Sequence, residues 1–326
     1  MNRWLYETLH PEIYHGHHRR PPFFEGWYYR LINAAEDRRY AIIPGIFLGS
    51  HPYAFIQVLE GHTRCSAFHV FPVEQFHADR KRFEVRIGEN VFTQNGLHLA
   101  LNRREPLGQL RGDLHFKGVQ PWPVRWTSPG IMGWYAWIPT MECYHGVLSF
   151  DHSLHGTLEV EGQNHAFDGG RGYIEKDWGK SFPSAYIWFQ SNHFKTSGVC
   201  LTASIAIIPW LRTSFRGFII GLWMDGALHR FATYTGARTE RLELQDQRVV
   251  WVVSDRKLRL ELEAVQAGGG LLYGPTRQDM GKRVDETLDA TIHVRLCQRS
   301  GPVLFEGTGH HAGLEINGDI PRLLKG

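Results

Sequence analysis

Alternating apolar and polar residues recur along much of this chain with a period of two. The segment 257–264 (KLRLELEA) alternates without interruption, which places Leu258, Leu260 and Leu262 on one face of a half-buried strand. Similar patterns predict further strands at 82–87, 97–101, 156–160, 249–253 and 291–296. A period of 3.6 residues is scarce, and it predicts one short helix near Arg277–Leu288. The pattern is that of a mainly β protein.

Turn signals separate the predicted strands. Asn95-Gly96, Asp225-Gly226 and Asn317-Gly318 stand between apolar segments, and such dipeptides tolerate the positive φ of tight hairpin turns. Many short strands favour an antiparallel barrel or sandwich. One eight-stranded barrel rarely needs more than about 200 residues, so a chain of 326 residues predicts two in tandem. A proline interrupts two strand-like segments at the boundary that we predict, between domains 1–182 and 183–326.

The composition narrows the class of protein. With 42% apolar and 21% charged residues, the chain is neither disordered nor collagen-like. A net charge of +3, carried by scattered rather than clustered cations, predicts no nucleic-acid partner. No apolar run approaches the roughly 18–20 residues that cross a bilayer. Residues 1–7 lack the apolar core of a secretory signal. The four cysteines lie far apart in the sequence, which predicts buried free thiols rather than disulfides. We therefore expect a cytoplasmic protein.

The first segment with chemical potential is 21–30 (PPFFEGWYYR). In a strand, Glu25 would share one face with Trp27 and Tyr29. A carboxylate among aromatic rings is costly to bury alone, so it must find a partner, face water or hold a proton. A structural ion pair, or a hydrogen bond to the backbone at a barrel mouth, is therefore the alternative to a catalytic acid.

The second segment is 172–183 (GYIEKDWGKSFP). In an extended chain Glu175 and Asp177 point to one side. Lys176 and Trp178 point to the other. Two neighbouring carboxylates raise each other's proton affinity, which keeps an acid protonated near neutral pH. The alternative is a solvated surface cluster in which the lysine pairs with one of the acids.

Both segments resemble signature sequences of the tocopherol cyclase family. Residues 22–30 are similar to the amino-terminal signature, and 173–183 together with 188–192 (WFQSN) are similar to the central one. Segments 274–276 (GPT) and 312–316 (AGLEI) resemble later family segments in the same order. The similarity thus spans nearly the whole chain. More loosely, the two glutamates near tryptophan resemble the wider superfamily that contains carotenoid hydratases.

The resemblance implies an all-β fold of two tandem lipocalin-like antiparallel β-barrels packed side by side. It also implies an isomerase of the tocopherol cyclase or class II terpene cyclase type that uses no cofactor and no metal. In such a reaction an acid protonates an alkene of a prenylated quinol or another isoprenoid. A phenolic oxygen or a second double bond then captures the cation. This chemistry needs a water-poor pocket with aromatic faces.

The resemblance also assigns roles to residues. Glu175 or Glu25 is the candidate proton donor. Lys176 and Asp177 would adjust its proton affinity, and plant members commonly carry Asn at position 177, which argues against Asp177 as the acid itself. The candidate substrate-binding residues are Trp27, Tyr28, Tyr29, Trp178, Trp188, Phe189, Asn192 and His193. The rings would form the pocket wall, and Tyr28 and the two polar members would orient a substrate hydroxyl or accept the final proton.

Other functions fit the same residues. A lipocalin-like protein can store or carry an apolar ligand unchanged, and tryptophan with paired carboxylates also serves glycosides. The histidine-rich run 14–18 (YHGHH) lacks the spacing of a known metal motif, and we predict no metal site there. A prenylated substrate would be drawn from a membrane, which predicts an apolar rim at the pocket mouth and peripheral membrane contact at most.

Overall fold

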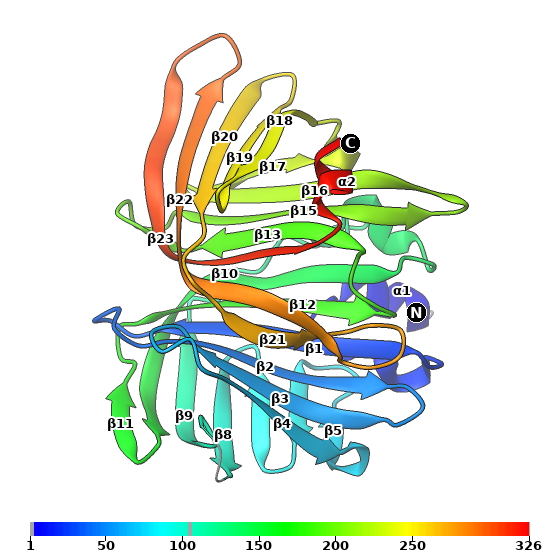
Figure 1. Cartoon of the computed structure of the whole chain (residues 1–326), viewed down its shortest axis with the longest axis vertical. Coiled ribbons are helices and arrows are strands. Elements are labelled where there is room, and N and C mark those ends of the chain that lie inside the picture. Colours follow the sequence, from blue (N-terminus) through cyan, green and yellow to red (C-terminus); the bar gives the residue numbers. More distant parts are fainter. Residues whose placement is uncertain (1–2, 104–105, 326) are drawn as a thin grey trace. The chain divides into compact units, whose positions relative to one another are not determined.

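The computed structural model describes residues 3–103 and 106–325 (Figure 1). The chain is mostly antiparallel strand, with short helices α1 (Arg3–Leu9) and α2 (Ile320–Lys325) near its ends. It divides into two compact units. The first extends to Phe182 and includes Gly270–Arg283, whereas the second comprises Pro183–Gly269 and the residues from Val284 onward. The segment 270–283 therefore belongs to the first unit, although the sequence division at 182 and 183 placed it in the second domain.

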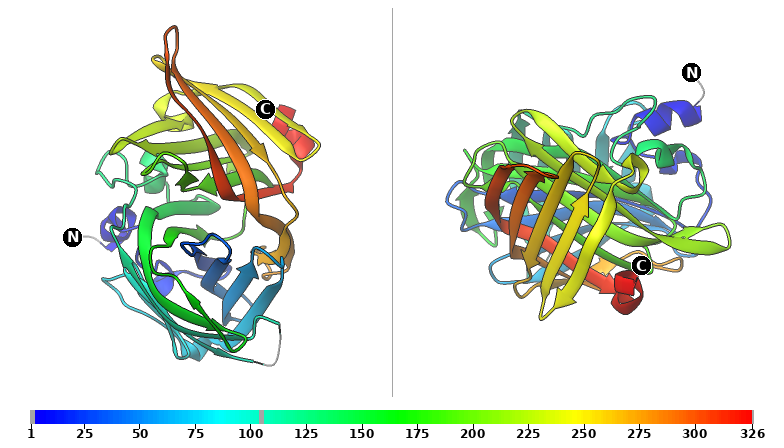
Figure 2. Two further views of the ribbon diagram at one scale, coloured as in Figure 1. Left: turned by 90° about the vertical axis from the view of Figure 1, so that its left-hand side faces the viewer. Right: turned by 90° about the horizontal axis from the view of Figure 1, so that it is seen from above.

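The sheet of the first unit has the strand order β4-β3-β2-β1-β12-β10-β9-β8-β7-β6-β5, with β11 beside β10. The bounds are β1 (Phe23–Ile32), β2 (Arg39–Leu48), β3 (Tyr53–Glu60), β4 (Ser66–Pro72), β5 (Phe76–Ala78), β6 (Glu84–Ile87), β7 (Asn90–Thr93), β8 (Gly96–Asn102), β9 (Gln109–Lys117), β10 (Cys143–Val160), β11 (Gln163–Ala166) and β12 (Arg171–Gly179). The sheet is strongly curved (Figure 2). Strand β21 (Gly270–Gly274) lies against β3, where the Gln57 amide donates to the carbonyl of Tyr273 over 2.8 Å.

The sheet of the second unit has the order β17-β16-β15-β13-β23-β22-β20-β19-β18, with β14 beside β23. The bounds are β13 (Ala185–Ser191), β14 (His193–Phe194), β15 (Cys200–Trp210), β16 (Thr213–Met224), β17 (Ala227–Ala232), β18 (Arg238–Gln245), β19 (Arg248–Ser254), β20 (Leu258–Val265), β22 (Lys282–Gln298) and β23 (Val303–Gly318). One apolar core fills this unit, and Phe189, Trp251 and Leu314 belong to it.

The strands predicted from alternation are present. In β20, Leu260 and Leu262 are buried in the core, as the period of two requires. The helix predicted near Arg277–Leu288 is wrong, because this stretch enters β22. Val284 and Leu288 are four residues apart, a spacing that fits a helix face as well as a strand face, and pairing with β23 decides for the strand.

Two smaller expectations need correction. Asn317-Gly318 does not form a hairpin, because it ends β23 just before α2, with the glycine at a φ of 87°. The four cysteines are free, and Cys200 and Cys297 are buried as predicted, but Cys65 is exposed. Within the described part of the chain, no helix combines the length and the apolarity needed to span a bilayer.

Candidate functional site

The two candidate proton donors, Glu25 and Glu175, lie on opposite faces of the sheet. In the antiparallel pair of β1 and β12, Glu25 stands opposite Trp178, and Tyr28 stands opposite Glu175. Residues that face each other across such a pair share a face, and neighbours along a strand alternate. Glu25 and Glu175 therefore project in opposite directions, although both are buried. They form two separate clusters of polar side chains.

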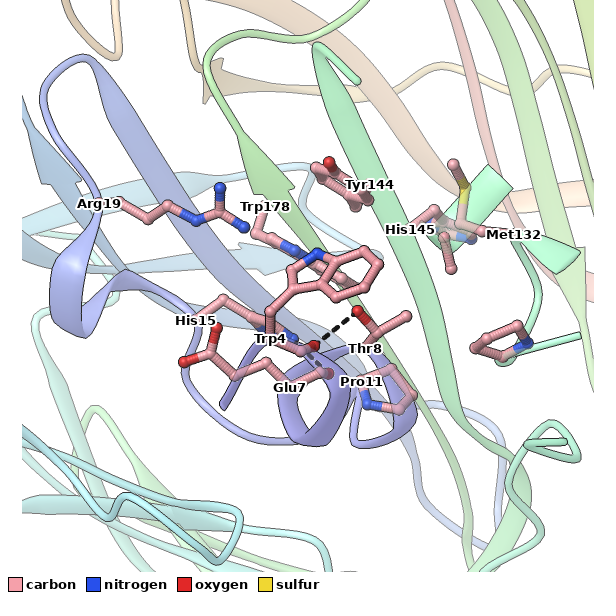
Figure 3. Close-up of a pocket in the computed structure, with 12 residues that line it drawn as sticks. Trp4, Glu7, Thr8, Pro11, His15, Arg19, Met132, Tyr144, His145 and Trp178 are labelled. Carbon is pink, nitrogen blue, oxygen red and sulfur yellow. Dashed lines mark hydrogen bonds between the residues drawn. The ribbon is translucent and has the colours of Figure 1, made fainter. Parts of the chain in front are cut away.

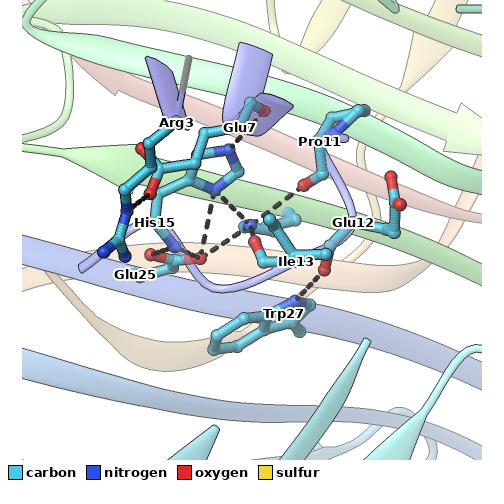
Figure 4. Close-up of polar contacts among 9 residues, drawn as sticks. Arg3, Glu7, Pro11, Glu12, Ile13, His15, Glu25 and Trp27 are labelled. Carbon is cyan, nitrogen blue, oxygen red and sulfur yellow. Dashed lines mark hydrogen bonds and ion pairs between the residues drawn. The ribbon is translucent and has the colours of Figure 1, made fainter. Parts of the chain in front are cut away.

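The first cluster surrounds the buried Lys176, and Figure 4 labels its partners Glu25, His15, Pro11 and Ile13. The ammonium Nζ of Lys176 lies 2.6 Å from Oε1 of Glu25. It also donates to the carbonyls of Pro11, over 2.9 Å, and of Ile13. The Nδ1 atom of His15 lies 2.8 Å from the same ammonium. Every one of these neighbours is an acceptor, so the cluster accommodates the charged, protonated lysine.

Glu25 is correspondingly an ionised acceptor. Burial would raise its pKa, but the charge of Lys176 and the hydrogen bonds with His15 hold the pKa of this carboxyl below its usual value. Both carboxylate oxygens accept the backbone N–H of His15, at 3.1 and 2.9 Å. Burial lowers the pKa of Lys176, but Glu25 opposes that shift. Glu25 is thus committed to an ion pair and holds no proton to donate.

This ion pair ties the amino-terminal segment to the sheet. The His15 ring stacks on Trp178 with ring centroids 4.4 Å apart, and its Nε2–H donates to the carbonyl of Glu7 over 3.0 Å. Burial and the neighbouring ammonium lower the pKa of His15, so the ring is neutral and its Nδ1 accepts from Lys176. The ammonium also lies over the rings of Trp27 and Trp178, at 5.1 and 4.6 Å from their centroids.

The second cluster contains Glu175 on the other face. The Tyr173 hydroxyl donates to its Oε2 over 2.5 Å. The Nε2 atom of His145, from the neighbouring strand β10, lies 3.7 Å from the same oxygen. The opposite ring nitrogen of His145, Nδ1, is 2.9 Å from Oδ1 of Asp177. One imidazole therefore stands between two carboxylates.

The imidazole of His145 is a cation at neutral pH. Burial opposes its charge, but Asp177 and Glu175 together raise the pKa of His145 to about 9. Its Nε2 has no hydrogen-bond partner among the described residues. The three side chains also offer ligand atoms within 4.8 Å of one another. A metal bound by all three would need both carboxylates at one ring nitrogen, however, and here they stand at different ones.

A pocket adjoins His145 and the stack of Trp178 on Tyr144, whose ring centroids lie 5.5 Å apart (Figure 3). The lining residues are Trp4, Glu7, Thr8, Pro11, His15, Arg19, Pro129, Met132, Ala136, Tyr144, His145 and Trp178. The space out to its mouth is about 430 Å³, but the part with room for a whole water molecule is about 30 Å³. That volume holds only a few waters. A prenyl chain would fit only after the lining moves.

The sequence of the chain is similar to that of a known protein family. The sequence profile described as tocopherol cyclase-like matches residues 101–318, which is more than half of its length. The chain belongs to the tocopherol cyclase-like family. It is 28% identical to "Tocopherol cyclase, chloroplastic" of Zea mays over 199 residues, which cover 57% of this chain and 41% of the maize protein. It is 25% identical to "Probable tocopherol cyclase, chloroplastic" of Oryza sativa subsp. japonica over 199 residues, which cover 57% and 42%.

The matched part thus spans about two fifths of each plant protein. Solved structures are similar over more of the chain. The crystal structure of CghA has a TM-score of 0.56 at 10% identity and covers 91% of this chain and 89% of CghA. An AttH-like protein from Nitrosomonas europaea has a TM-score of 0.51 at 13% identity, covering 90% and 92%. These similarities concern the fold, and they confirm the all-β, lipocalin-like architecture predicted for this family member.

The predicted site residues fall into three groups. Lys176 and Trp27 join Glu25, so the lysine adjusts the proton affinity of Glu25 and not of Glu175. Asp177 joins Glu175, and Tyr28 shares their face by its register. The third group comprises Tyr29 and the residues of the second unit.

Tyr29 is fully buried in the first unit, where its hydroxyl donates to the carbonyl of Thr93 over 2.9 Å. Phe189 packs in the core of the second unit, with its ring centroid 6.1 Å from that of Trp251. Trp188 is buried, and in β13 it alternates with Phe189. Asn192 and His193 contact each other in the second unit, with 2.8 Å between Oδ1 and Nδ1. Their roles in binding stay predictions.

Three residues at these clusters escaped the sequence analysis as site members. Tyr173 lies two positions before Glu175, so the period of two could have placed it on the same face. His15 occurs in the histidine-rich run, which was considered only for metal binding. His145 gave no signal, because it lies on a separate strand and meets the acids through the pairing of β10 with β12.

The ionisation of His145 leads to a pH prediction. A ring whose folded-state pKa is about 9 stabilises the fold fully below the unfolded value near 6.5, and this contribution is lost as pH rises through about 9. We expect a histidine signal that titrates near pH 9 in an NMR titration of the wild type and disappears in His145→Gln. Asp177→Asn should move that midpoint downward, because it removes the nearer carboxylate. An unchanged midpoint in Asp177→Asn would contradict the assignment.

Proposed function

We propose that this member of the tocopherol cyclase-like family is a cofactor-independent cyclase that protonates an alkene of a prenylated quinol or another isoprenoid. Membership of the family supports a cyclase-type enzyme at a coarse level. The finer proposal depends on one observation, which is the buried Glu175 beside the cationic ring of His145. The reaction requires Glu175 to hold a proton, which its burial favours, and His145 is already paired with Asp177 over 2.9 Å.

Three groups compete for the role of proton donor. Glu25 is excluded by its ion pair with Lys176. An imidazolium with a pKa of about 9 is too weak an acid to protonate an alkene efficiently. A carboxyl group on Glu175 is intrinsically the stronger acid, and its nearest cation, His145 at 3.7 Å, is paired with Asp177 over 2.9 Å, unlike the 2.6 Å ion pair that keeps Glu25 ionised. We therefore assign the donor role to Glu175 and a positioning role to His145.

The proposed step balances without a redox partner. The O–H bond of Glu175 breaks as a C–H bond forms on one alkene carbon, leaving a tertiary cation on the other. The phenolic oxygen of the substrate attacks that cation and closes the ring by a C–O bond. The phenolic proton then returns to the carboxylate of Glu175. The product is an isomer of the substrate.

The cation needs aromatic faces and little water. On the face of Glu175, Tyr173 contacts the carboxylate and Tyr28 shares the face by its register, and each favourable ring face is worth roughly 0.5–2 kcal/mol. Glu175 does not line the pocket described above, and it projects from the face of β12 opposite to Trp178, so the proposal requires the substrate to reach Glu175 from that other face.

Reaction in deuterated water tests the proposal. In H₂O, incubation with a prenylated hydroquinone should give a product of equal mass and altered chromatographic retention. In D₂O the same product should carry one non-exchangeable deuterium, because the donor proton exchanges with solvent before it enters the C–H bond. A cyclised product without deuterium would exclude initiation by protonation. Recovery of only unchanged ligand from a panel of prenylated phenols would instead favour a binding or carrier protein.

A further inference from the structure

Trp4, Trp126 and Trp137, from two distant parts of the sequence, form one cluster in the first unit, and Trp134 lies in the same short helix as Trp137. Trp4 comes from α1, Trp134 and Trp137 belong to the short helix Gly133–Trp137, and Trp126 precedes it. The ring centroids of Trp137 lie 5.2 Å from Trp4 and 4.9 Å from Trp126. The indole N–H of Trp137 also donates to the carbonyl of Trp126 over 3.0 Å. We call these four residues the tryptophan patch.

The tryptophan patch is open to solvent. Trp126 is 59% exposed, Trp134 43% and Trp4 39%. Apolar rings gathered on a surface are costly in water, and a concentration of them marks a surface that binds something. The patch is continuous with the pocket, because Trp4 and the neighbouring Met132 line it. Its occupant would therefore meet the entrance to the pocket.

The charges around the tryptophan patch are positive. Arg19, beside the pocket, and Arg125, next to Trp126, take part in no ion pair among the residues that the structure describes. The nearby acid Glu7 is already neutralised, since its Oε1 lies 2.7 Å from Nε of Arg3. The free charges at this surface are thus cations, and they complement an anionic partner.

We propose that the tryptophan patch docks on an anionic lipid surface. Tryptophan has an apolar ring and an N–H donor, and it prefers the boundary between lipid and water. Cations next to such rings add attraction to anionic headgroups, and the two contributions together suffice for reversible binding. That the lipid also supplies the substrate depends on the proposed function, whereas the binding itself does not. A second copy of the chain is the other occupant that the test must separate.

Co-sedimentation of the full chain with vesicles tests this docking. We expect binding to phosphatidylcholine vesicles that contain phosphatidylglycerol, together with a blue shift of tryptophan fluorescence. Binding should fall several-fold between low and high salt, because salt screens the cations. Trp126→Ala/Trp134→Ala should weaken binding by about tenfold or more, since two rings leave the lipid boundary. Neither residue lines the pocket, so this variant should retain turnover of a detergent-dispersed substrate.

A matched control keeps the result interpretable. Leu211, at the β15–β16 turn of the second unit, is 97% exposed, and Leu211→Ala should bind vesicles like the wild type. Equal vesicle binding by wild type and Trp126→Ala/Trp134→Ala would overturn the proposal. A concentration-dependent dimer of the wild type that Trp126→Ala/Trp134→Ala abolishes would also overturn the proposal, because a second copy of the chain would then cover the tryptophan patch. Vesicle binding by a catalytically inactive protein would contradict only the proposed function.

Discussion

Glu175→Gln is expected to fold normally and to lose cyclisation activity by a factor of about 10²–10⁴, the usual worth of a positioned general acid. Glutamine keeps the shape of the side chain and can still accept from Tyr173, whose hydroxyl lies 2.5 Å from the carboxylate. It has no acidic proton, however, so the alkene cannot be protonated. Turnover of a prenylated hydroquinone under single-turnover conditions measures the loss directly.

Two comparisons make this result specific to the acid. Glu89→Gln changes an exposed glutamate of the same unit and should retain full activity. His145→Gln should lose less than Glu175→Gln and should also lose the fall in activity that the wild type shows as pH rises through about 9. A well-folded Glu175→Gln protein with undiminished turnover would eliminate the assignment of the donor.

Lys176→Met is expected to lower the free energy of unfolding of the first unit by about 3–5 kcal/mol, because it leaves Glu25 as a buried and uncompensated charge. The lysine is fully buried, and its Nζ lies 2.6 Å from that carboxylate. It also holds the carbonyl of Pro11, so the variant should release the amino-terminal segment. Denaturant unfolding measures the stability, and limited proteolysis near residues 3–18 measures the release.

The double variant Lys176→Met/Glu25→Gln provides the control. Removing both charges should recover part of the lost stability, since a neutral amide is less costly to bury than an unpaired carboxylate. The N–H of His15 can still donate to the glutamine oxygen. If Lys176→Met were as stable as the wild type, Glu25 would have to be protonated. Glu25 would then no longer be excluded as the proton donor.

The two substitutions also test the separation of the clusters. Lys176 and Glu175 are adjacent in sequence but project from opposite faces of β12. Lys176→Met should therefore alter stability and the anchoring of α1, whereas Glu175→Gln should alter the chemical step. Adjacent residues with such different effects are the expected consequence of strand alternation.

The strand content and the faces of the critical strands follow from the order of apolar and polar residues alone. Alternation in 257–264 and in the two aromatic signatures needs no partner strand to be interpreted, because side chains on any strand alternate. The opposite directions of Glu175 and Lys176 followed from this rule alone. The resemblance to the tocopherol cyclase family came from the same signatures, and the match over residues 101–318 shows that membership.

The contacts of each acid depend on how distant strands pair. The register of β1 against β12 puts Glu25 next to Lys176, and the pairing of β10 with β12 brings His145 between Glu175 and Asp177. Such contacts join residues far apart in the chain, and no local pattern encodes a register between distant strands. For the same reason the helix predicted near Arg277–Leu288 failed: the spacing of its apolar residues suited two structures, and pairing with β23 selected the strand.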